Sequence, residues 1–263
     1  MTKINLNKID TRAPEKISKG DTKVKLQKLQ FRMEELQNLM YAEGKHALLV
    51  ILQGMDASGK DGAIKNVFES VNPMGCRVTA FKTPTSEEMK HDFLWRIHQQ
   101  VPEKGMIGIF NRSHYEDVLI QRVHKWVTEK IVRQRYVQIN AFEKLLQQTG
   151  TTVLKFYLHV SREEQQQRLN ERLTDPSKMW KHNSNDAKEQ TFYKEYRKAY
   201  HDAFANCSES AEWMIIPSDQ NWYKEYLIAK KIVDTLENFK MKYPKLPKEE
   251  VNAGITEIRS EGD

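Results

Sequence analysis

The sequence lacks the features of membrane-spanning, secreted and disulfide-stabilised proteins. No apolar run approaches the roughly 18 residues that a helix needs to cross a bilayer, and the polar N-terminal region lacks the apolar core of a secretory signal. The only two cysteines, Cys76 and Cys207, lie far apart without metal-ligand spacing, so each is expected to be a buried or idle thiol. These absences favour a protein of the reducing cytoplasm with no membrane partner.

Repeats, linkers and familiar catalytic sets are also missing. No internal repeat and no stretch rich in Gly, Pro or Ser divides the chain, which favours a single domain. There is no evident Ser/His/Asp or Cys/His set for nucleophilic catalysis. There is also no RNA-binding signature and no DNA-reading motif, so a nucleic-acid partner is not expected.

The sequence does have the composition of a globular protein that meets anions. It has 263 residues, of which 39% are hydrophobic, and this is enough for a sizeable core. Its net charge of +6 and its isoelectric point near 9.1 favour an anionic partner of some kind. Taken alone, this charge is equally consistent with a role in solubility only.

Apolar runs alternate with helical patterns along the chain. Continuous apolar runs, typical of strands buried on both faces, occupy residues 46–53, 77–81, 106–110, 152–160 and 213–217. Helical spacing covers residues 23–42, 60–71, 86–100, 131–148, 163–173, 186–206 and 221–243. The alternation predicts an α/β fold with a doubly wound parallel sheet.

The ends of the chain and one internal segment differ from this pattern. Residues 1–21 are polar without periodicity and are interpreted as a mobile or draped tail, and residues 246–263 as a polar C-terminal tail. Residues 22–245 then form the single domain. Within it, residues 168–200 are dense in Arg, Lys, Trp and Tyr, which indicates an exposed helical excursion that covers something.

A phosphate-binding loop follows the first predicted strand. The run GMDASGKDG from Gly54 matches the G-x-x-x-x-G-K pattern between a buried strand and a helix. Backbone amides of such a loop converge on phosphate oxygens, and the helix N-terminus adds partial positive charge. Lys60 supplies a mobile cation for the phosphoryl group. The predicted phosphate-binding residues are Gly54, Ala57, Ser58, Gly59, Lys60, Asp61 and Gly62.

The loop departs from the common pattern in its carboxylates. The Ser or Thr that usually follows the lysine and helps to hold Mg²⁺ is replaced by Asp61. Asp56 lies within the loop, where a carboxylate would repel bound phosphate unless a divalent cation stood between them. Asp56 is therefore predicted to bind Mg²⁺. Asp61 has two open interpretations, a metal ligand or a residue that complements the helix dipole.

Polar residues also follow the third predicted strand. The run NRSHYED begins at Asn111, where ligands of open parallel sheets bind. Arg112 suits bidentate phosphate contact, and Glu116 or Asp117 could hold a metal-bound water or a nucleotide. A solvated loop is the alternative. The end of the second strand, Phe81, Lys82, Thr83 and Pro84, is predicted to form the slot for the nucleotide base.

These runs together resemble one family. GMDASGKDG, FKTPT from Phe81, IFNRSHYEDVL from Ile109 and DPSKMWK from Asp175 are similar to polyphosphate kinase, type 2, over about residues 28–244. The resemblance implies phosphoryl transfer between inorganic polyphosphate and nucleotides with Mg²⁺ (or Mn²⁺). It also implies a thymidylate-kinase-like sheet sandwiched by helices, a helical lid at about residues 165–200, and a homodimer or homotetramer.

The resemblance assigns roles to individual residues. Asp56, Lys60, Asn111 and Arg112 fall on its phosphate-binding motifs, and Asp56, Lys60 and Arg112 are the expected catalytic set. Asn111 and Glu116 replace the Asp and Asn of members restricted to nucleoside diphosphates, which implies AMP as well as ADP as acceptor. A basic channel for polyphosphate is then expected from Lys60, Lys65, Arg112, Arg122, Arg168, Arg172, Lys178 and Lys181.

Two other functions share parts of this pattern. A nucleoside monophosphate kinase that uses ATP would have the same loop, metal and lid, although its single triphosphate needs fewer cations. A nucleic-acid-binding NTPase would use the positive charge but lacks a recognition motif. Adenine nucleotides, and guanine nucleotides as a second class, are the expected small-molecule partners of the polyphosphate enzyme.

Overall fold

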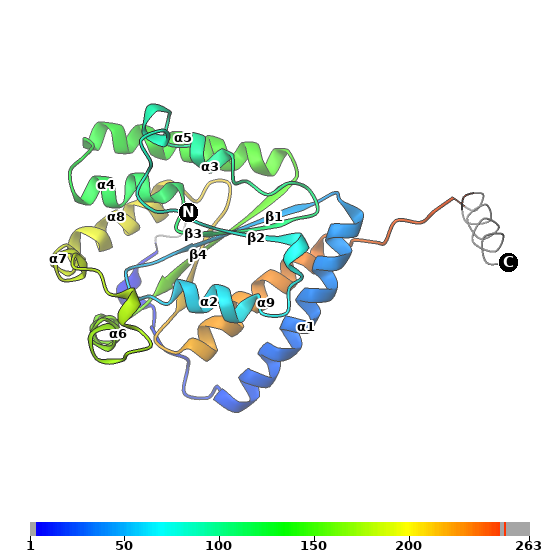
Figure 1. The fold of residues 1–263 in the computed structure, drawn as a ribbon, viewed down its shortest axis with the longest axis horizontal. Helices are drawn as coiled ribbons and strands as arrows, with labels where there is room; N and C mark the ends of the chain where they lie inside the picture. The colour runs from blue at the N-terminus through cyan, green and yellow to red at the C-terminus, as the bar shows by residue number, and fades with distance from the viewer. Residues whose placement is uncertain (1–3, 248–249, 251–263) are drawn as a thin grey trace.

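Five parallel strands form a twisted sheet at the centre of the protein. The computed structural model describes residues 4–247 and 250. Its strand order is β2-β3-β1-β4-β5, so the sheet is doubly wound about β1, as predicted (Figure 1). The strands are β1 (Ala47–Gln53), β2 (Cys76–Ala80), β3 (Ile107–Asn111), β4 (Thr151–His159) and β5 (Trp213–Pro217).

Helices cover both faces of the sheet. α1, α2 and α9 pack on one face, and α3, α4, α5 and α8 lie on the other (Figure 1). The alternation within β1 explains the two layers, because Leu48 and Val50 point to the first face while Leu49 and Ile51 point to the second. These helices are α1 (Lys19–Glu43), α2 (Lys60–Val67), α3 (Trp95–His98), α4 (Ile120–Val123), α5 (Glu129–Gln148), α8 (Tyr193–Asn206) and α9 (Asn221–Asn238).

A helical excursion stands at the end of the sheet where the strands finish. It consists of α6 (Arg162–Thr174), a 3-10 turn η5 (Met179–Lys181) and α7 (Asp186–Thr191). Few of its side chains are buried, since Gln165 is the only buried residue of α6 and neither η5 nor α7 has one. The excursion occupies most of the segment predicted as a lid.

Several predicted helices have different limits in the structure, and three of them differ in kind or length as follows. The helix predicted over residues 86–100 is only a 3-10 turn (Glu88–Lys90) and α3, because Asp92 accepts a hydrogen bond from the Leu94 amide at 2.9 Å and starts a new turn. The helix predicted over residues 186–206 is divided between α7 and α8 at Phe192, whose ring packs edge-on against His124. α9 ends at Asn238, five residues before its predicted limit.

The second strand differs from its predicted environment. β2 was expected to be buried on both faces, but no residue in it is fully buried and Val78 is 51% exposed. The physical reason is its position, since β2 pairs with β3 alone among the described strands and forms an edge of the sheet. Its continuous apolar run therefore does not indicate burial here.

Part of the segment predicted as an N-terminal tail packs onto the domain. Leu6 is buried in the second core cluster, and the Thr11 hydroxyl donates to Asp219 at 2.7 Å. The amide of Ala13 donates to Gln220 at 2.9 Å. α1 begins at Lys19 with Ser18 as its N-cap, so residues 19–21 belong to that helix. The predicted C-terminal tail lies mostly outside the described residues.

Within residues 4–247 and 250, no helix is both long and apolar enough to cross a bilayer.

Candidate active site

The phosphate loop lies between the buried strand β1 and helix α2. Gly54 starts the loop where the chain passes close to its neighbours: a Cβ at this position would lie 2.6 Å from Ser58 Oγ and 3.0 Å from the Leu158 carbonyl oxygen. Gly59 has a φ of 90°, which favours glycine, and it precedes the first residue of α2. The loop therefore places the N-terminus of a helix at the end of the central strand, as a phosphate site requires.

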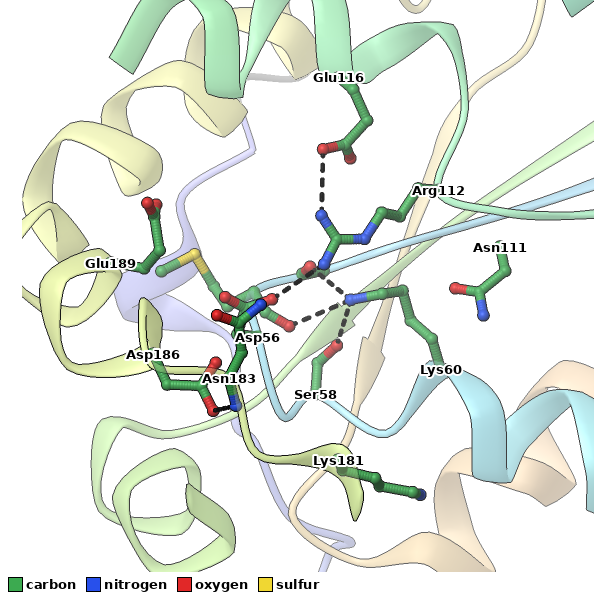
Figure 2. A network of polar contacts seen from close by, with 12 residues as sticks. Asp56, Ser58, Lys60, Asn111, Arg112, Glu116, Lys181, Asn183, Asp186 and Glu189 are labelled. Atoms are coloured by element: carbon green, nitrogen blue, oxygen red, sulfur yellow. Dashed lines mark hydrogen bonds and ion pairs between the residues drawn. The ribbon is translucent and has the colours of Figure 1, made fainter. Parts of the chain in front are cut away.

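The Lys60 ammonium is turned back into the loop (Figure 2). It donates to the carbonyl oxygens of Gly54 at 2.9 Å and Met55 at 3.3 Å, and to Ser58 Oγ at 3.4 Å. Burial, followed by the nearby Arg112 cation, lowers the pKa of Lys60 to about 8. A phosphate oxygen bound in the loop would compete with these three acceptors for the hydrogen bonds that the Lys60 ammonium donates.

The lowered pKa of Lys60 predicts a pH dependence. Because the cation is lost as pH rises through about 8, kcat/KM for an anionic phosphoryl donor should fall between about pH 7 and about pH 10. The Lys60→Arg variant keeps its charge over this range, and any activity it retains should not show that fall. The measurement is the pH profile of initial rates at low donor concentration. A flat wild-type profile to about pH 10 would contradict the assignment.

Arg112 joins the loop after β3 to the phosphate loop. Its guanidinium lies 3.2 Å from Asp56 Oδ1 and 3.4 Å from Glu116 Oε2 (Figure 2). These carboxylates raise the pKa of Arg112 above its ordinary value, with Glu116 making the largest contribution. Arg112 also has a φ of 65°, a left-handed conformation that is uncommon for arginine. The backbone conformation directs the side chain across the site.

The parallel register of the sheet brings the two motifs together. Asn111 at the end of β3 pairs with Leu52 near the end of β1, so both strands reach the same edge. There the Asn111 amide donates to Asp61 Oδ1 at 2.7 Å. Asp61 is thus linked to the second motif, in addition to its place in the first turn of α2.

A cavity of about 1130 Å³ extends from this point to the lid. Most predicted site residues line it: every residue from Gly54 to Gly62, Phe81, Lys82, Thr83, Asn111, Arg112, Glu116, Arg168, Arg172, Lys178 and Lys181. Phe81, although at its wall, is only 6% exposed and packs edge-on against Phe110. It is thus a core residue more than an open platform for a base.

Several lid cations already have acidic or backbone partners. Arg168 donates to the Ala57 carbonyl oxygen at 3.0 Å and to Glu164 at 2.8 Å. Arg172 pairs with Asp186 at 2.9 Å, and Lys178 pairs with Glu171 at 2.8 Å. Lys181 lines the cavity and has no ion pair with any residue in the described part of the chain. The channel is less uniformly basic than the sequence suggests.

Four predicted site residues lie outside the cavity. Lys65 is exposed on the outer side of α2, and Pro84 does not reach the cavity wall. Arg122 is bound instead by Glu129 at 2.7 Å and Asp202 at 2.8 Å. Asp117 is buried beside Gln121 and Arg135, and burial raises its pKa to about 6. Adjacent residues of a 3-10 turn point in different directions, so Glu116 faces the cavity and Asp117 does not.

Two buried residues at the site were not predicted. Lys224 on α9 donates to the Gly59 carbonyl oxygen at 3.2 Å and to Asn221 at 2.8 Å. Burial and the nearby Arg168 lower the pKa of Lys224 to about 8. Gln53, the last residue of β1, contacts the loop after β3. Gln53 could have been identified as a site residue because it is a polar residue at the end of an apolar strand. No local pattern distinguishes Lys224.

Asp186, Glu189 and Asn183 add polar groups on the lid side of the cavity (Figure 2). Glu189 joins the lid to the core, since its carboxylate lies 3.0 Å from His124 Nε2 and accepts from the Tyr196 hydroxyl at 2.7 Å. The lid is therefore held against the end of α4 and against α8 by two partly buried hydrogen bonds of Glu189.

The site suits a divalent cation that is shared with a substrate. Asp56 presents a carboxylate that is one-third exposed, and Asp61 lies across the loop. Among the described residues, no group of three or more His, Cys, Asp or Glu side chains could enclose a metal by itself. Mg²⁺ is usually held by one or two carboxylates together with water and substrate phosphates, so this donor set fits that ion.

Several known proteins are similar to this chain in sequence and in fold. Residues 16–244 match the family model described as Polyphosphate kinase 2. The AMP/ADP-polyphosphate phosphotransferase of Meiothermus ruber is 50% identical over 81% of this chain and 80% of its own length. The ADP-polyphosphate phosphotransferase of Rhodopseudomonas palustris is 39% identical over 81% and 78%. The crystal structure of polyphosphate kinase 2 from Arthrobacter aurescens superposes with a TM-score of 0.91, at 40% identity, over 97% of this chain and 93% of that one. The chain belongs to the polyphosphate kinase 2 family.

Proposed function

We propose that this protein transfers a phosphoryl group between inorganic polyphosphate and AMP or ADP. One observation carries the proposal: a single large cavity joins the phosphate loop, Arg112 and the lid. Three exposed lysines of that cavity, Lys82, Lys181 and Lys188, form no ion pair with any described residue. A long polyanion supplies partners for such dispersed cations, which a single triphosphate would not need.

The reaction needs no general base from the protein. A nucleotide phosphate oxygen is already ionised at pH 7 and attacks the terminal phosphorus of the chain in line, while the bond to the next bridging oxygen breaks. Lys60 and Arg112 stabilise the negative charge on the transferred group by hydrogen bonds to its oxygens. The loop amides position the phosphate, and the lid excludes water from it.

A divalent cation, Mg²⁺ or Mn²⁺, is part of this proposal. Asp56 is the carboxylate that would hold it, with Asp61 or Glu116 as a second contributor. When bound, the ion supplies neutralisation of charge on the phosphate oxygens. Asp117 is not included because it is buried away from the cavity.

Both AMP and ADP are proposed as acceptors, with adenine favoured and guanine as a second class. Support comes from Asn111 and Glu116, and from the 50% identical relative, which is named for AMP and ADP. The homodimer or homotetramer implied by the family remains part of the proposal. Light scattering coupled to size-exclusion chromatography measures this oligomeric state directly.

The deciding experiment supplies each acceptor with each donor. Purified protein is incubated with Mg²⁺, either long-chain polyphosphate or ATP, and AMP, ADP, GMP or GDP, and the products are resolved by ion-exchange chromatography. We expect ADP and ATP from AMP and polyphosphate. Transfer to AMP from ATP but not from polyphosphate would instead identify a nucleoside monophosphate kinase. No transfer, with salt-dependent binding to oligonucleotides, would identify a nucleic-acid-binding protein.

A further inference from the structure

Gln53 lies where three parts of the candidate site meet. It is the last residue of β1, fully buried, and directly precedes Gly54 of the phosphate loop. Its amide contacts Ser113 and Glu116 of the loop after β3, and Tyr200 of the helix α8 that supports the lid. A buried glutamine needs partners for both ends of its amide, and these residues supply them.

The chemistry of the neighbours fixes the orientation of the amide. The Ser113 backbone N–H can only donate, and it lies 3.0 Å from one end of the Gln53 amide, which must therefore be the oxygen. The amide nitrogen then faces Glu116 Oε1 at 3.1 Å and the Tyr200 hydroxyl at 3.3 Å. Gln53 thus donates a charge-assisted hydrogen bond to a carboxylate at the edge of the cavity.

We propose that Gln53 is a positioning residue that holds the Glu116 carboxylate in place and thereby sets the preference of the enzyme between AMP and ADP. The inference rests on the proposed function, since it concerns the nucleotide acceptor of that reaction. Gln53 does not itself line the cavity, so it acts on the nucleotide only through Glu116.

The Glu116 carboxylate depends on Gln53 for its shorter hydrogen bond. One carboxylate oxygen faces the Arg112 guanidinium at 3.4 Å, which is long for a charged hydrogen bond. The other oxygen faces the Gln53 amide nitrogen at 3.1 Å. Without Gln53, the longer contact is the one polar contact that the described residues leave to this carboxylate, and it is made to an arginine that also faces Asp56. Glu116 would then be free to turn within the cavity.

The position of one carboxylate affects AMP and ADP differently. ADP carries one more negative phosphate group than AMP, so a fixed negative charge beside the acceptor phosphates favours the shorter nucleotide. Glu116 is largely buried, with a side chain that is 15% exposed, and its charge is therefore less screened than a surface carboxylate. Loss of its fixed position should weaken this repulsion and raise the use of ADP relative to that of AMP.

The test compares Gln53→Met, Glu116→Gln and the double variant. kcat and KM are measured for AMP, ADP and polyphosphate. We expect Gln53→Met to lower kcat/KM for AMP by about 10-fold relative to ADP, the scale of one hydrogen bond to a charged group. The KM for polyphosphate should change by less than about 2-fold. In the Glu116→Gln background, Gln53→Met should change the AMP-to-ADP ratio by less than about 2-fold, because the partner is already lost.

A charge exchange tests the same contact without a cavity or an apolar replacement. Gln53→Glu alone places two carboxylates together and should lower kcat/KM for both nucleotides, whereas Gln53→Glu with Glu116→Gln restores an amide–carboxylate hydrogen bond. The double variant should recover at least about 10-fold of the kcat/KM for ADP that Gln53→Glu loses, while its AMP-to-ADP ratio stays that of Glu116→Gln. This comparison also decides the question if Gln53→Met does not fold.

Gln37 offers a matched control. It is a fully buried glutamine on α1, distant from the cavity, and Gln37→Met should leave the AMP-to-ADP ratio unchanged. The inference is overturned if Gln53→Met has the same effect with and without Glu116, or if it alters polyphosphate and AMP equally. Failure of the wild-type protein to use polyphosphate at all would overturn the proposed function instead, so the two outcomes are distinct.

Discussion

Replacing Lys60 by alanine should lower kcat by at least about 10²-fold, the scale of losing one group that stabilises charge in the transition state. Lys60 is the cation of the phosphate loop, and its ammonium already lies among the Gly54 and Met55 carbonyl oxygens and Ser58 Oγ. No other lysine of the loop can replace it. The measurement is the initial rate of ATP formation from ADP and polyphosphate, at saturating concentrations of both.

Lys65 is the matched control for this variant. It lies on the same helix, but it is exposed and does not line the cavity. Lys65→Ala should therefore keep the wild-type rate within about 2-fold, because surface substitutions away from a site have small effects. A folded Lys60→Ala protein with near-normal kcat would remove the phosphate loop from the proposed mechanism. An equal loss in Lys65→Ala would restore Lys65 to the predicted channel.

Replacing Lys155 by methionine should lower the free energy of unfolding by about 3–5 kcal/mol, the usual result of breaking a buried ion pair from one side. Lys155 and Glu143 are both fully buried, with Nζ and Oε2 2.6 Å apart. Burial alone would raise the pKa of Glu143, but Lys155 and His114 overcome this effect and hold it below its ordinary value. Without Lys155, the carboxylate has no cation partner unless His114 becomes protonated.

Denaturant unfolding measures the loss of unfolding free energy. Two further variants test whether that loss comes from the unpaired buried charge. Lys155→Met with Glu143→Gln should recover part of the stability, since the unpaired charge is also removed. Lys198→Met breaks an exposed pair with Asp202 and should cost less than about 1 kcal/mol. A Lys155→Met protein as stable as the wild type would show that the buried pair contributes little.

The same buried pair supports the active site. His114 and Tyr115 contact Glu143 at 3.3 and 2.7 Å, and both lie in the turn between Arg112 and Glu116. Loss of the pair should therefore also reduce activity at temperatures where the protein remains folded. No local pattern indicates this network, because it joins residues from the 3-10 turn η4 (His114–Val118), α5 and β4.

The sequence predicted the fold well where local pattern and burial agree. The limits of β5 were predicted without error, and those of β1 differ by one residue, because strands of a parallel sheet form short continuous apolar runs. The fold class and the family are confirmed. β2 has a similar pattern but is an edge strand, since periodicity does not record the position of a strand within a sheet.

The residues that line the cavity could be predicted where a motif follows the end of a strand, but not where a partner residue lies far away in the sequence. The phosphate loop and the Arg112 loop lie together because β1 and β3 are neighbours. Asp117 was misplaced because sequence does not give the direction of side chains in a 3-10 turn. Arg122 has acidic partners at positions 129 and 202 that no local pattern indicates. Lys224 reaches the loop from α9, far along the chain.

The pairing of the first long helix with the last has a consequence for how the chain is made. α1 and α9 lie side by side on one face of the sheet (Figure 1), and Arg32 of α1 pairs with Glu237 of α9 at 3.0 Å. During synthesis, α1 leaves the ribosome before its apolar partners Ile228, Ile232 and Leu236. Until these residues emerge, Leu26, Met33 and Met40 lack part of their apolar contacts. A nascent chain must therefore extend at least as far as α9 before this core can close, and exposed apolar surface of that kind favours aggregation.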